Sequence, residues 1–141
     1  MAVDFLIDVD RQVVFTVAVD VLTMGDGLDH MNRLQADPRF SPVFNQIADF
    51  RAVTEVRLSG FDVRDLAKRT LFSPEARRAL VITRPLAFGL ARMFRILRGL
   101  RGENYLTVVR ELDEAARWTG VDPHVAADTC ATLAARLKTS G

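Results

Sequence analysis

Cysteine and the polar aromatics are scarce in this sequence, and each scarcity excludes a class of protein. A single cysteine, Cys130, cannot form an internal disulfide, so nothing predicts an oxidising compartment. One tryptophan, one tyrosine and a net charge of +1 argue against a nucleic-acid-binding module. No apolar run reaches the roughly 18 residues that a membrane span needs, and acidic residues stand where a secretory signal would be basic. We therefore expect a cytoplasmic protein with no stable membrane insertion.

The two histidines and the cysteine form no recognisable catalytic or metal-binding set. Cys130 follows His124 by six residues, which places the two side chains on different faces of a helix. We interpret Cys130 as a small core residue. His30 follows Asp26 by four residues on one helical face, but two ligands do not close a metal site, so we interpret this pair as an exposed polar face. The sequence thus predicts no catalytic residue, no metal site and no cofactor.

The spacing of apolar residues predicts alternating strands and helices in a chain of 141 residues, the length of one domain. Apolar runs predict strands over 3–7, 13–21, 43–50, 78–83 and 105–110. Spacings of three and four predict helices over 23–36, 62–72, 85–98, 112–118 and 123–137. Residues 51–58 are ambiguous between a loop and a short extended piece. The last helix places four apolar residues on one face, namely Ala126, Cys130, Leu133 and Leu137.

This order of elements predicts an α/β fold. Strands and helices alternate from residue 43 onward, which is typical of parallel βαβ units. The first two strands flank a turn at Asp8-Val9-Asp10, which indicates an antiparallel hairpin. We therefore expect a mixed sheet of four or five strands with helices packed on it.

Several stretches of the sequence resemble one family. They are Asp37-Pro38-Arg39-Phe40 leading to Ala48-Asp49-Phe50-Arg51, then Ala76-Arg77-Arg78-Ala79-Leu80-Val81-Ile82, then Leu86-Ala87-Phe88-Gly89-Leu90-Ala91-Arg92-Met93, with the segment 109–118. In these stretches and in its order of elements the chain resembles the STAS-like domains, in particular small SpoIIAA-like bacterial proteins. The resemblance covers residues 5–120. It implies a STAS-like domain over 1–120 and an appended helix over 121–141, both within one domain.

The resemblance implies a non-enzymatic switch or docking module that acts through protein contacts. In the antagonist branch of the family, a serine near the start of the helix after the third strand is phosphorylated. The nearest match is Ser59, although Arg57-Leu58 stands where an acidic residue normally precedes the serine. We interpret Ser59 as the residue that begins the helix and bonds its backbone N–H groups, with a phosphosite as the alternative.

Basic residues are unevenly spread along the chain, with seven arginines and no acid within 77–102. Three predicted strands end in an arginine, at Arg51, Arg84 and Arg110. Ligands of open α/β sheets bind outside the carboxyl ends of the strands. We hypothesise that these three arginines converge on an anionic group. The alternative is three solvated arginines beside loops.

The helix predicted over 85–98 has a wide apolar face and four arginines, Arg92, Arg95, Arg98 and Arg101, around the rest of its circumference. We expect its apolar side to pack on the sheet and to supply part of a protein interface, rather than to lie on a membrane. The leading hypothesis for function is a regulatory module that binds an unknown protein partner or a second copy of itself. The alternative is a carrier or sensor of a small anionic or lipidic ligand, held by the strand-end arginines.

Overall fold

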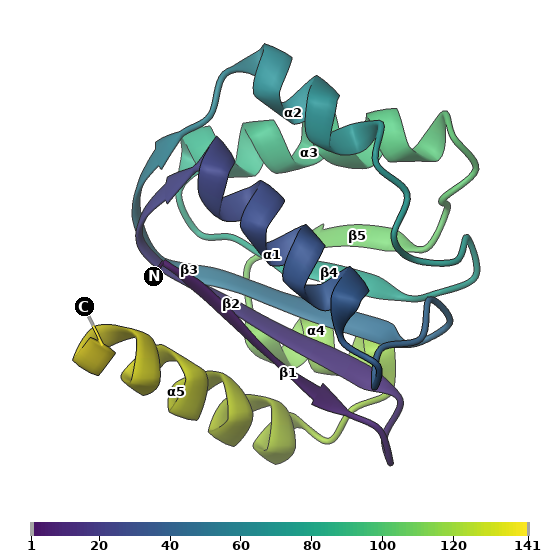
Figure 1. Ribbon diagram of the computed structural model, residues 1–141, viewed down its shortest axis with the longest axis vertical. Coiled ribbons are helices and arrows are strands. Elements are labelled where there is room, and N and C mark those ends of the chain that lie inside the picture. The colour runs from purple at the N-terminus through teal and green to yellow at the C-terminus, as the bar shows by residue number, and fades with distance from the viewer. Residues whose placement is uncertain (1, 141) are drawn as a thin grey trace.

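The structure, a computed structural model, describes residues 2–140 and contains every predicted strand and helix (Figure 1). The strands are β1 (Val3–Asp8), β2 (Val13–Thr23), β3 (Asn45–Arg57), β4 (Arg78–Val81) and β5 (Leu106–Val109). The helices are α1 (Met24–Ala36), α2 (Gly60–Ala67), α3 (Pro85–Gly99), α4 (Leu112–Thr119) and α5 (Pro123–Ser140).

The five strands form one mixed sheet in the order β1-β2-β3-β4-β5. β1 pairs antiparallel with β2, and the other neighbours pair parallel, which confirms the expected α/β fold. Each connection between two parallel strands contains one helix and leads to the next strand in the same direction across the sheet. Because such crossovers share one hand, their helices α1, α2 and α3 lie on the same face of the sheet (Figure 1). Helices α4 and α5 cover the opposite face.

Most boundaries differ from the sequence prediction by a few residues, and two differences are larger. The ambiguous residues 51–58 mostly continue β3, because residues 52–57 pair with the second half of β2. The helix predicted over 62–72 ends at Ala67. It ends early because Phe72 is buried beside the first helix, with its ring edge-on to Phe40 at a centroid distance of 5.3 Å.

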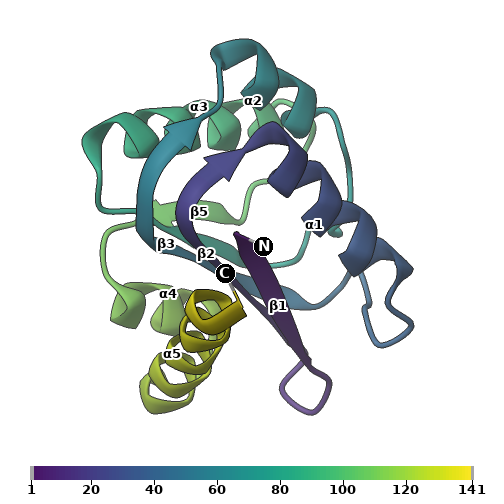
Figure 2. The same cartoon turned by 60° about the vertical axis from the view of Figure 1, so that its left-hand side comes forward.

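The long strands β2 and β3 curl away from the plane of the sheet (Figure 2). Their register shifts twice, between Val17 and Val19 and between Asp20 and Val21. Such bulges bend a strand pair and increase its twist. Asp20 itself has a φ of 59°, in the left-handed region. The curl carries the ends of both strands toward α1 and α2 and encloses space above the sheet.

The face covered by α4 and α5 is packed as one continuous core. Apolar residues of β2, β3 and β4 meet both helices in a single cluster of buried side chains. The predicted apolar face of α5 is confirmed, since all four of its residues are buried. Cys130 is a core residue, as expected, and burial raises the pKa of its thiol to about 12. A thiol this difficult to ionise is inert.

The face covered by α1, α2 and α3 is packed differently. Its buried residues divide into separate clusters, one near α1 and another beneath α3. Leu34 is the one fully buried residue of α1. The space between these clusters is the candidate site.

Candidate functional site: an apolar cavity with a buried polar relay

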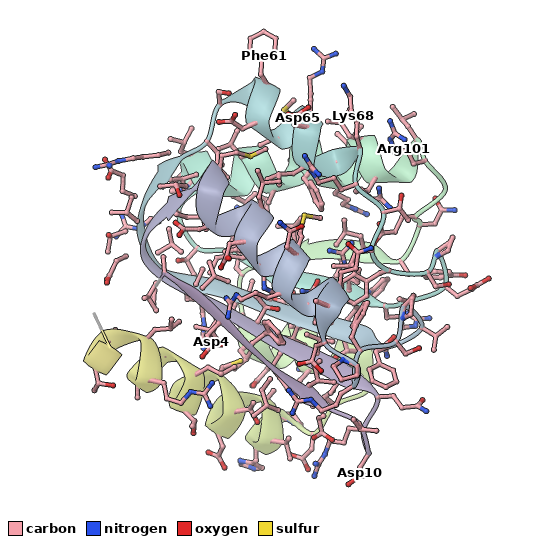
Figure 3. All side chains as sticks on the ribbon, in the orientation of Figure 1. Asp4, Asp10, Phe61, Asp65, Lys68 and Arg101 are labelled. Atoms are coloured by element: carbon pink, nitrogen blue, oxygen red, sulfur yellow. The ribbon has the colours of Figure 1, made fainter. Side chains whose placement is uncertain are left out.

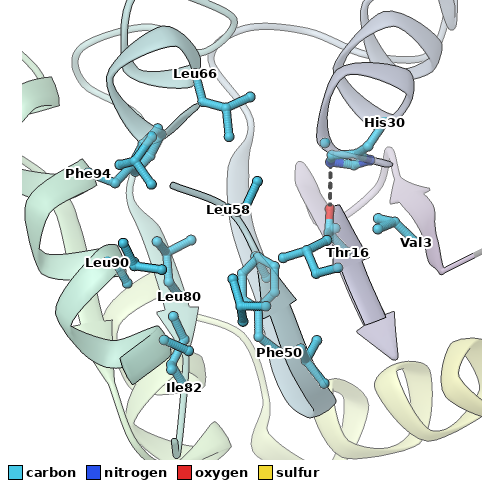
Figure 4. Close-up of a pocket in the computed structure, with 18 of the residues that line it drawn as sticks. Val3, Thr16, His30, Phe50, Leu58, Leu66, Leu80, Ile82, Leu90 and Phe94 are labelled. Atoms are coloured by element: carbon cyan, nitrogen blue, oxygen red, sulfur yellow. Dashed lines mark hydrogen bonds between the residues drawn. The ribbon is translucent and has the colours of Figure 1, made fainter. Parts of the chain in front are cut away.

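An apolar cavity of about 180 Å³ lies between the sheet and helices α1, α2 and α3 (Figure 4). Large aliphatic and aromatic side chains line most of it, among them Phe50, Leu58, Leu66, Leu80, Leu90 and Phe94. An apolar cavity of about 150 Å³ stays dry in water and accepts a guest such as benzene. The cavity here therefore suits an apolar ring or a short alkyl segment.

The curl of β2 and β3 and a glycine on α1 create this cavity. Leu22, Val53 and Val56 line it from the curled ends of the two strands. Gly27 lines it from α1, where an added Cβ would lie 3.6 Å from Leu66. The absent side chain keeps this part of the cavity open.

One side of the cavity is polar, because three neighbouring strands each place a polar side chain there. Arg78 Nε donates to Gln46 Oε1 at 3.0 Å, and Gln46 Nε2 donates to Thr16 Oγ1 at 3.0 Å. Thr16 Oγ1 lies 3.4 Å from His30 Nε2 on α1 (Figure 4). These four residues line the cavity. We call them, with Glu103 and Arg98 below, the polar relay.

The relay continues into a buried ion cluster. Glu103 accepts from Arg78 Nη1 at 2.6 Å and from Arg98 Nε at 2.7 Å. Arg98 Nη1 also donates to the carbonyl oxygens of Ala67 and Arg69 at the end of α2. Arg98 and Glu103 are each 3% exposed, so Arg98 is a buried member of the four arginines that lie outside the apolar face of this helix. Burial lowers the pKa of Arg78, and the charge of Glu103 opposes this.

His30 faces the cavity rather than solvent, so its interpretation as part of an exposed polar face is wrong. Its ring is edge-on to Phe5 at a centroid distance of 5.6 Å. Burial and the charges of Arg33 and Arg78 lower its pKa to about 4, against the opposing charges of Asp29 and Asp4. Within residues 2–140, its Nδ1 is buried and has no hydrogen-bond partner.

Asp26, the other member of the predicted pair, serves α1 instead. Thr23 Oγ1 accepts from the backbone N–H of Asp26 at 3.2 Å, and Asp26 Oδ2 accepts from the backbone N–H of Thr23 at 3.0 Å. This reciprocal capping box satisfies two donors at the start of the helix. His30 is thereby left without a carboxylate from its own helix face.

The three strand-end arginines do not line one cavity. Arg51 and Arg110 line a second groove, between β3, α4 and α5. Arg51 pairs there with the buried Asp49, Nε to Oδ1 at 2.9 Å, and this pairing raises the pKa of Arg51. Glu111 and Asp113 also line this groove, so its acids outnumber its bases. Anion binding by Arg51 and Arg110 stays a prediction.

Arg84 lines the apolar cavity instead and donates from Nε to the carbonyl oxygen of Val53 at 2.9 Å. The guanidinium of Arg110 lies over the Phe88 ring, 4.3 Å from its centroid. The structure therefore brings two of the three predicted arginines together and leaves Arg84 at the other site.

Ser59 begins α2, which confirms its interpretation as a capping residue. Its Oγ accepts from the backbone N–H of Asp62 at 3.1 Å, and Asp62 Oδ2 accepts from the backbone N–H of Ser59 at 2.9 Å. Phosphorylation of Ser59, which is exposed, stays a prediction.

Sequence reasoning missed most of the relay, including Thr16, Gln46 and Glu103. A signal was present, since Thr16 lies among buried apolar residues of β2, and Gln46 directly precedes the buried Ile47 and Ala48 of β3. A buried polar side chain needs a partner, and here each finds the next one along the relay. Over residues 2–140, no group of three potential metal ligands gathers, and no helix is long and apolar enough to cross a membrane.

Comparison with known proteins gives similarity of structure and not of sequence family. No family model and no curated protein matches the chain. The chain is similar to the crystal structure of an uncharacterised protein of the DUF3478 family, with a SpoIIAA-like fold, from Shewanella loihica PV-4. The TM-score is 0.55 at 15% identity, over 84% of this chain and 94% of that chain. The chain has a SpoIIAA-like fold, as its sequence resemblance implied.

Proposed function

We propose that this protein binds a small lipidic molecule in the cavity between the sheet and α1, α2 and α3, without transforming it. The observation that carries the proposal is the cavity itself, apolar over most of its lining and polar on one side. Ligand sites are typically concave and apolar, with a few polar groups that orient the ligand. The proposed setting is the cytoplasm, where the single cysteine would stay reduced.

The chemistry of the polar side supports binding without turnover. Thr16 and His30 resemble a nucleophile and its base, but a catalytic base needs a pKa near the working pH. The pKa of His30 is about 4, so its imidazole accepts protons poorly at neutral pH. A third group that would orient His30 through Nδ1 is absent from the described residues.

A matched pair of glycine substitutions tests the cavity. Gly27→Leu places a side chain against Leu66 in the cavity, whereas Gly89→Leu on α3 projects into open space. We expect Gly27→Leu to weaken binding of the neutral probe N-phenylnaphthylamine at least about tenfold, or about 1.4 kcal/mol, and Gly89→Leu to leave it unchanged. Native mass spectrometry of the purified protein then reports any ligand retained from the host. Equal probe affinity in both variants, with no retained ligand, would contradict the proposal.

A second candidate function, docking of a protein partner or a second copy, rests on a different surface. Phe61 on α2 and Leu100 after α3 are 79% and 80% exposed, and Leu86 and Ile96 on α3 are also exposed. Figure 3 shows Phe61 projecting away from the end of α2. Exposed large apolar side chains on neighbouring helices favour a contact surface.

Sedimentation at rising protein concentration tests this candidate. A dimer that forms with concentration and is lost in Phe61→Ser supports self-association through this surface. A monomer at all concentrations in both proteins removes the second-copy version of the hypothesis.

A further inference from the structure

Every second residue from Arg78 to Arg84 lines the apolar cavity. Arg78 begins β4, Leu80 and Ile82 follow it, and Arg84 comes directly before α3. Side chains two residues apart on an extended chain lie on the same face, so these four residues follow the cavity from the start of β4 to the start of α3. The two arginines therefore lie at opposite ends of an apolar stretch.

The two arginines differ in burial and in partners. Arg78 is 9% exposed, and its Nη1 lies 2.6 Å from the carboxylate of Glu103. Arg84 is exposed, whereas every other residue that lines the cavity is buried or half-buried. Arg84 is thus the lining residue that reaches solvent most. We therefore place the mouth of the cavity at Arg84.

The charge of Arg84 is uncompensated within residues 2–140. Its hydrogen bond in this part of the chain runs from Nε to the carbonyl oxygen of Val53, which leaves both terminal nitrogens of the guanidinium free to donate. Among the described residues, the lining of the cavity includes no aspartate or glutamate. The first turn of α3 contains no acid either, so the helix dipole adds to the positive potential beside Arg84. The mouth therefore favours an anion.

We propose that the ligand of this cavity is a carboxylate with an apolar tail, whose head group pairs with Arg84 at the mouth while the tail lies along Leu80 and Ile82. This inference rests on the proposed function and names its ligand class. The planar guanidinium presents paired N–H donors that match the two oxygens of a carboxylate. A head group at the mouth also keeps much of its water, so its charge is not buried. A protonated amine offers no acceptor and is repelled by Arg84.

Calorimetric titration at neutral pH with octanoate, octanol and octylamine tests the head group on one tail. An exposed ion pair contributes up to about fivefold in affinity, so we expect Arg84→Gln to weaken the binding of octanoate by about that factor. Octanol should bind to this variant as before, and octylamine should bind more tightly because the repelling charge is gone. The matched control is Arg92→Gln, since Arg92 is exposed on α3 and does not line the cavity. It should leave all three affinities unchanged.

The salt dependence of binding to the unaltered protein tests the same pairing and needs no variant to fold. The screening length falls from about 30 Å at about 0.01 M salt to about 3 Å at about 1 M. We expect the affinity for octanoate to fall over this range relative to the affinity for octanol. The same change in the two affinities, whether on Arg84→Gln or on added salt, would overturn the inference while leaving the proposed function intact. No binding of any of the three compounds, together with no retained ligand, would overturn both.

Discussion

The two faces of the same sheet are packed differently. On one face, side chains of β2, β3 and β4 pack against α4 and α5 in one continuous buried cluster. On the other face, the clusters beneath α1 and α3 are separate, with an apolar cavity and a buried polar relay between them. The strands supply both faces from alternating residues, so the difference comes from the helices and from the curl of β2 and β3.

The difference in packing bears on where the stability of the fold comes from and on where a ligand would fit. Close packing gains the most free energy per residue and leaves no room for a guest. A cavity reduces stability, and a ligand that fills it recovers part of that loss. We therefore expect the face with α4 and α5 to contribute most of the stability, while the proposed binding site lies on the face with α1, α2 and α3. Four measurements test this expectation.

The largest effect is expected at Glu103, the carboxylate shared by two buried arginines. Removing one partner of a buried ion pair costs about 3–5 kcal/mol, because the remaining charge is left uncompensated. We expect Glu103→Gln to lower the free energy of unfolding by about this amount in urea denaturation. The control is Glu55→Gln, at an exposed pair with Arg57, where we expect less than about 1 kcal/mol. Similar losses in the two variants would show that the ion cluster does not stabilise the cavity face.

The next largest effect on the free energy of unfolding is expected when a leucine on each face of the sheet is replaced by alanine. Leu133 on α5 is fully buried, and Leu133→Ala should cost about 2–5 kcal/mol. Leu90 on α3 lines the existing cavity and is partly exposed, so Leu90→Ala should cost about 1 kcal/mol. Denaturation curves in the absence of ligand measure both. A loss at Leu90 as large as that at Leu133 would contradict the distinction between the faces.

The pH dependence of stability should come in part from His30. Its pKa is about 4 when folded and about 6.5 in an unfolded chain, so the unfolded state binds more protons between these values. Stability from the neutral ring is fully present above pH 6.5 and is lost as the pH falls toward 4, by up to about 3 kcal/mol. Urea denaturation from pH 7 to pH 4.5 should show a shallower decline in His30→Phe. A decline of the same steepness in His30→Phe as in the unaltered protein would contradict this origin of the pH dependence.

The smallest effect is expected at Ser59, the capping residue of α2 above the cavity. Loss of an N-cap side chain costs about 1 kcal/mol. Ser59→Ala should lower the stability by about that amount, whereas Ser59→Asp preserves a capping oxygen and should keep it. Thermal denaturation followed by circular dichroism distinguishes the two. If Ser59→Asp is as unstable as Ser59→Ala, a negative charge at this position is not tolerated by the helix, which would also argue against phosphorylation there.

Local patterns in the sequence were sufficient for most of the fold. The apolar run at 78–83 predicts a strand buried on both faces, and Pro85 predicts the start of α3, because both depend on neighbouring residues only. The cap at Ser59 and the buried face of α5 were predictable for the same reason. Residues 51–58 were not, since their extended conformation depends on pairing with β2 across a bulge.

The candidate site depended on tertiary structure. Its polar relay joins six residues from separate parts of the chain, namely Thr16, His30, Gln46, Arg78, Arg98 and Glu103. Arg98 follows the same spacing as its exposed neighbours on α3, and only the position of Glu103 after the helix explains its burial. Local sequence patterns specify which segments form strands and helices, because those preferences act over a few residues. Which polar groups are buried together follows from the packed fold, because burial and hydrogen-bond partners depend on how distant segments pack.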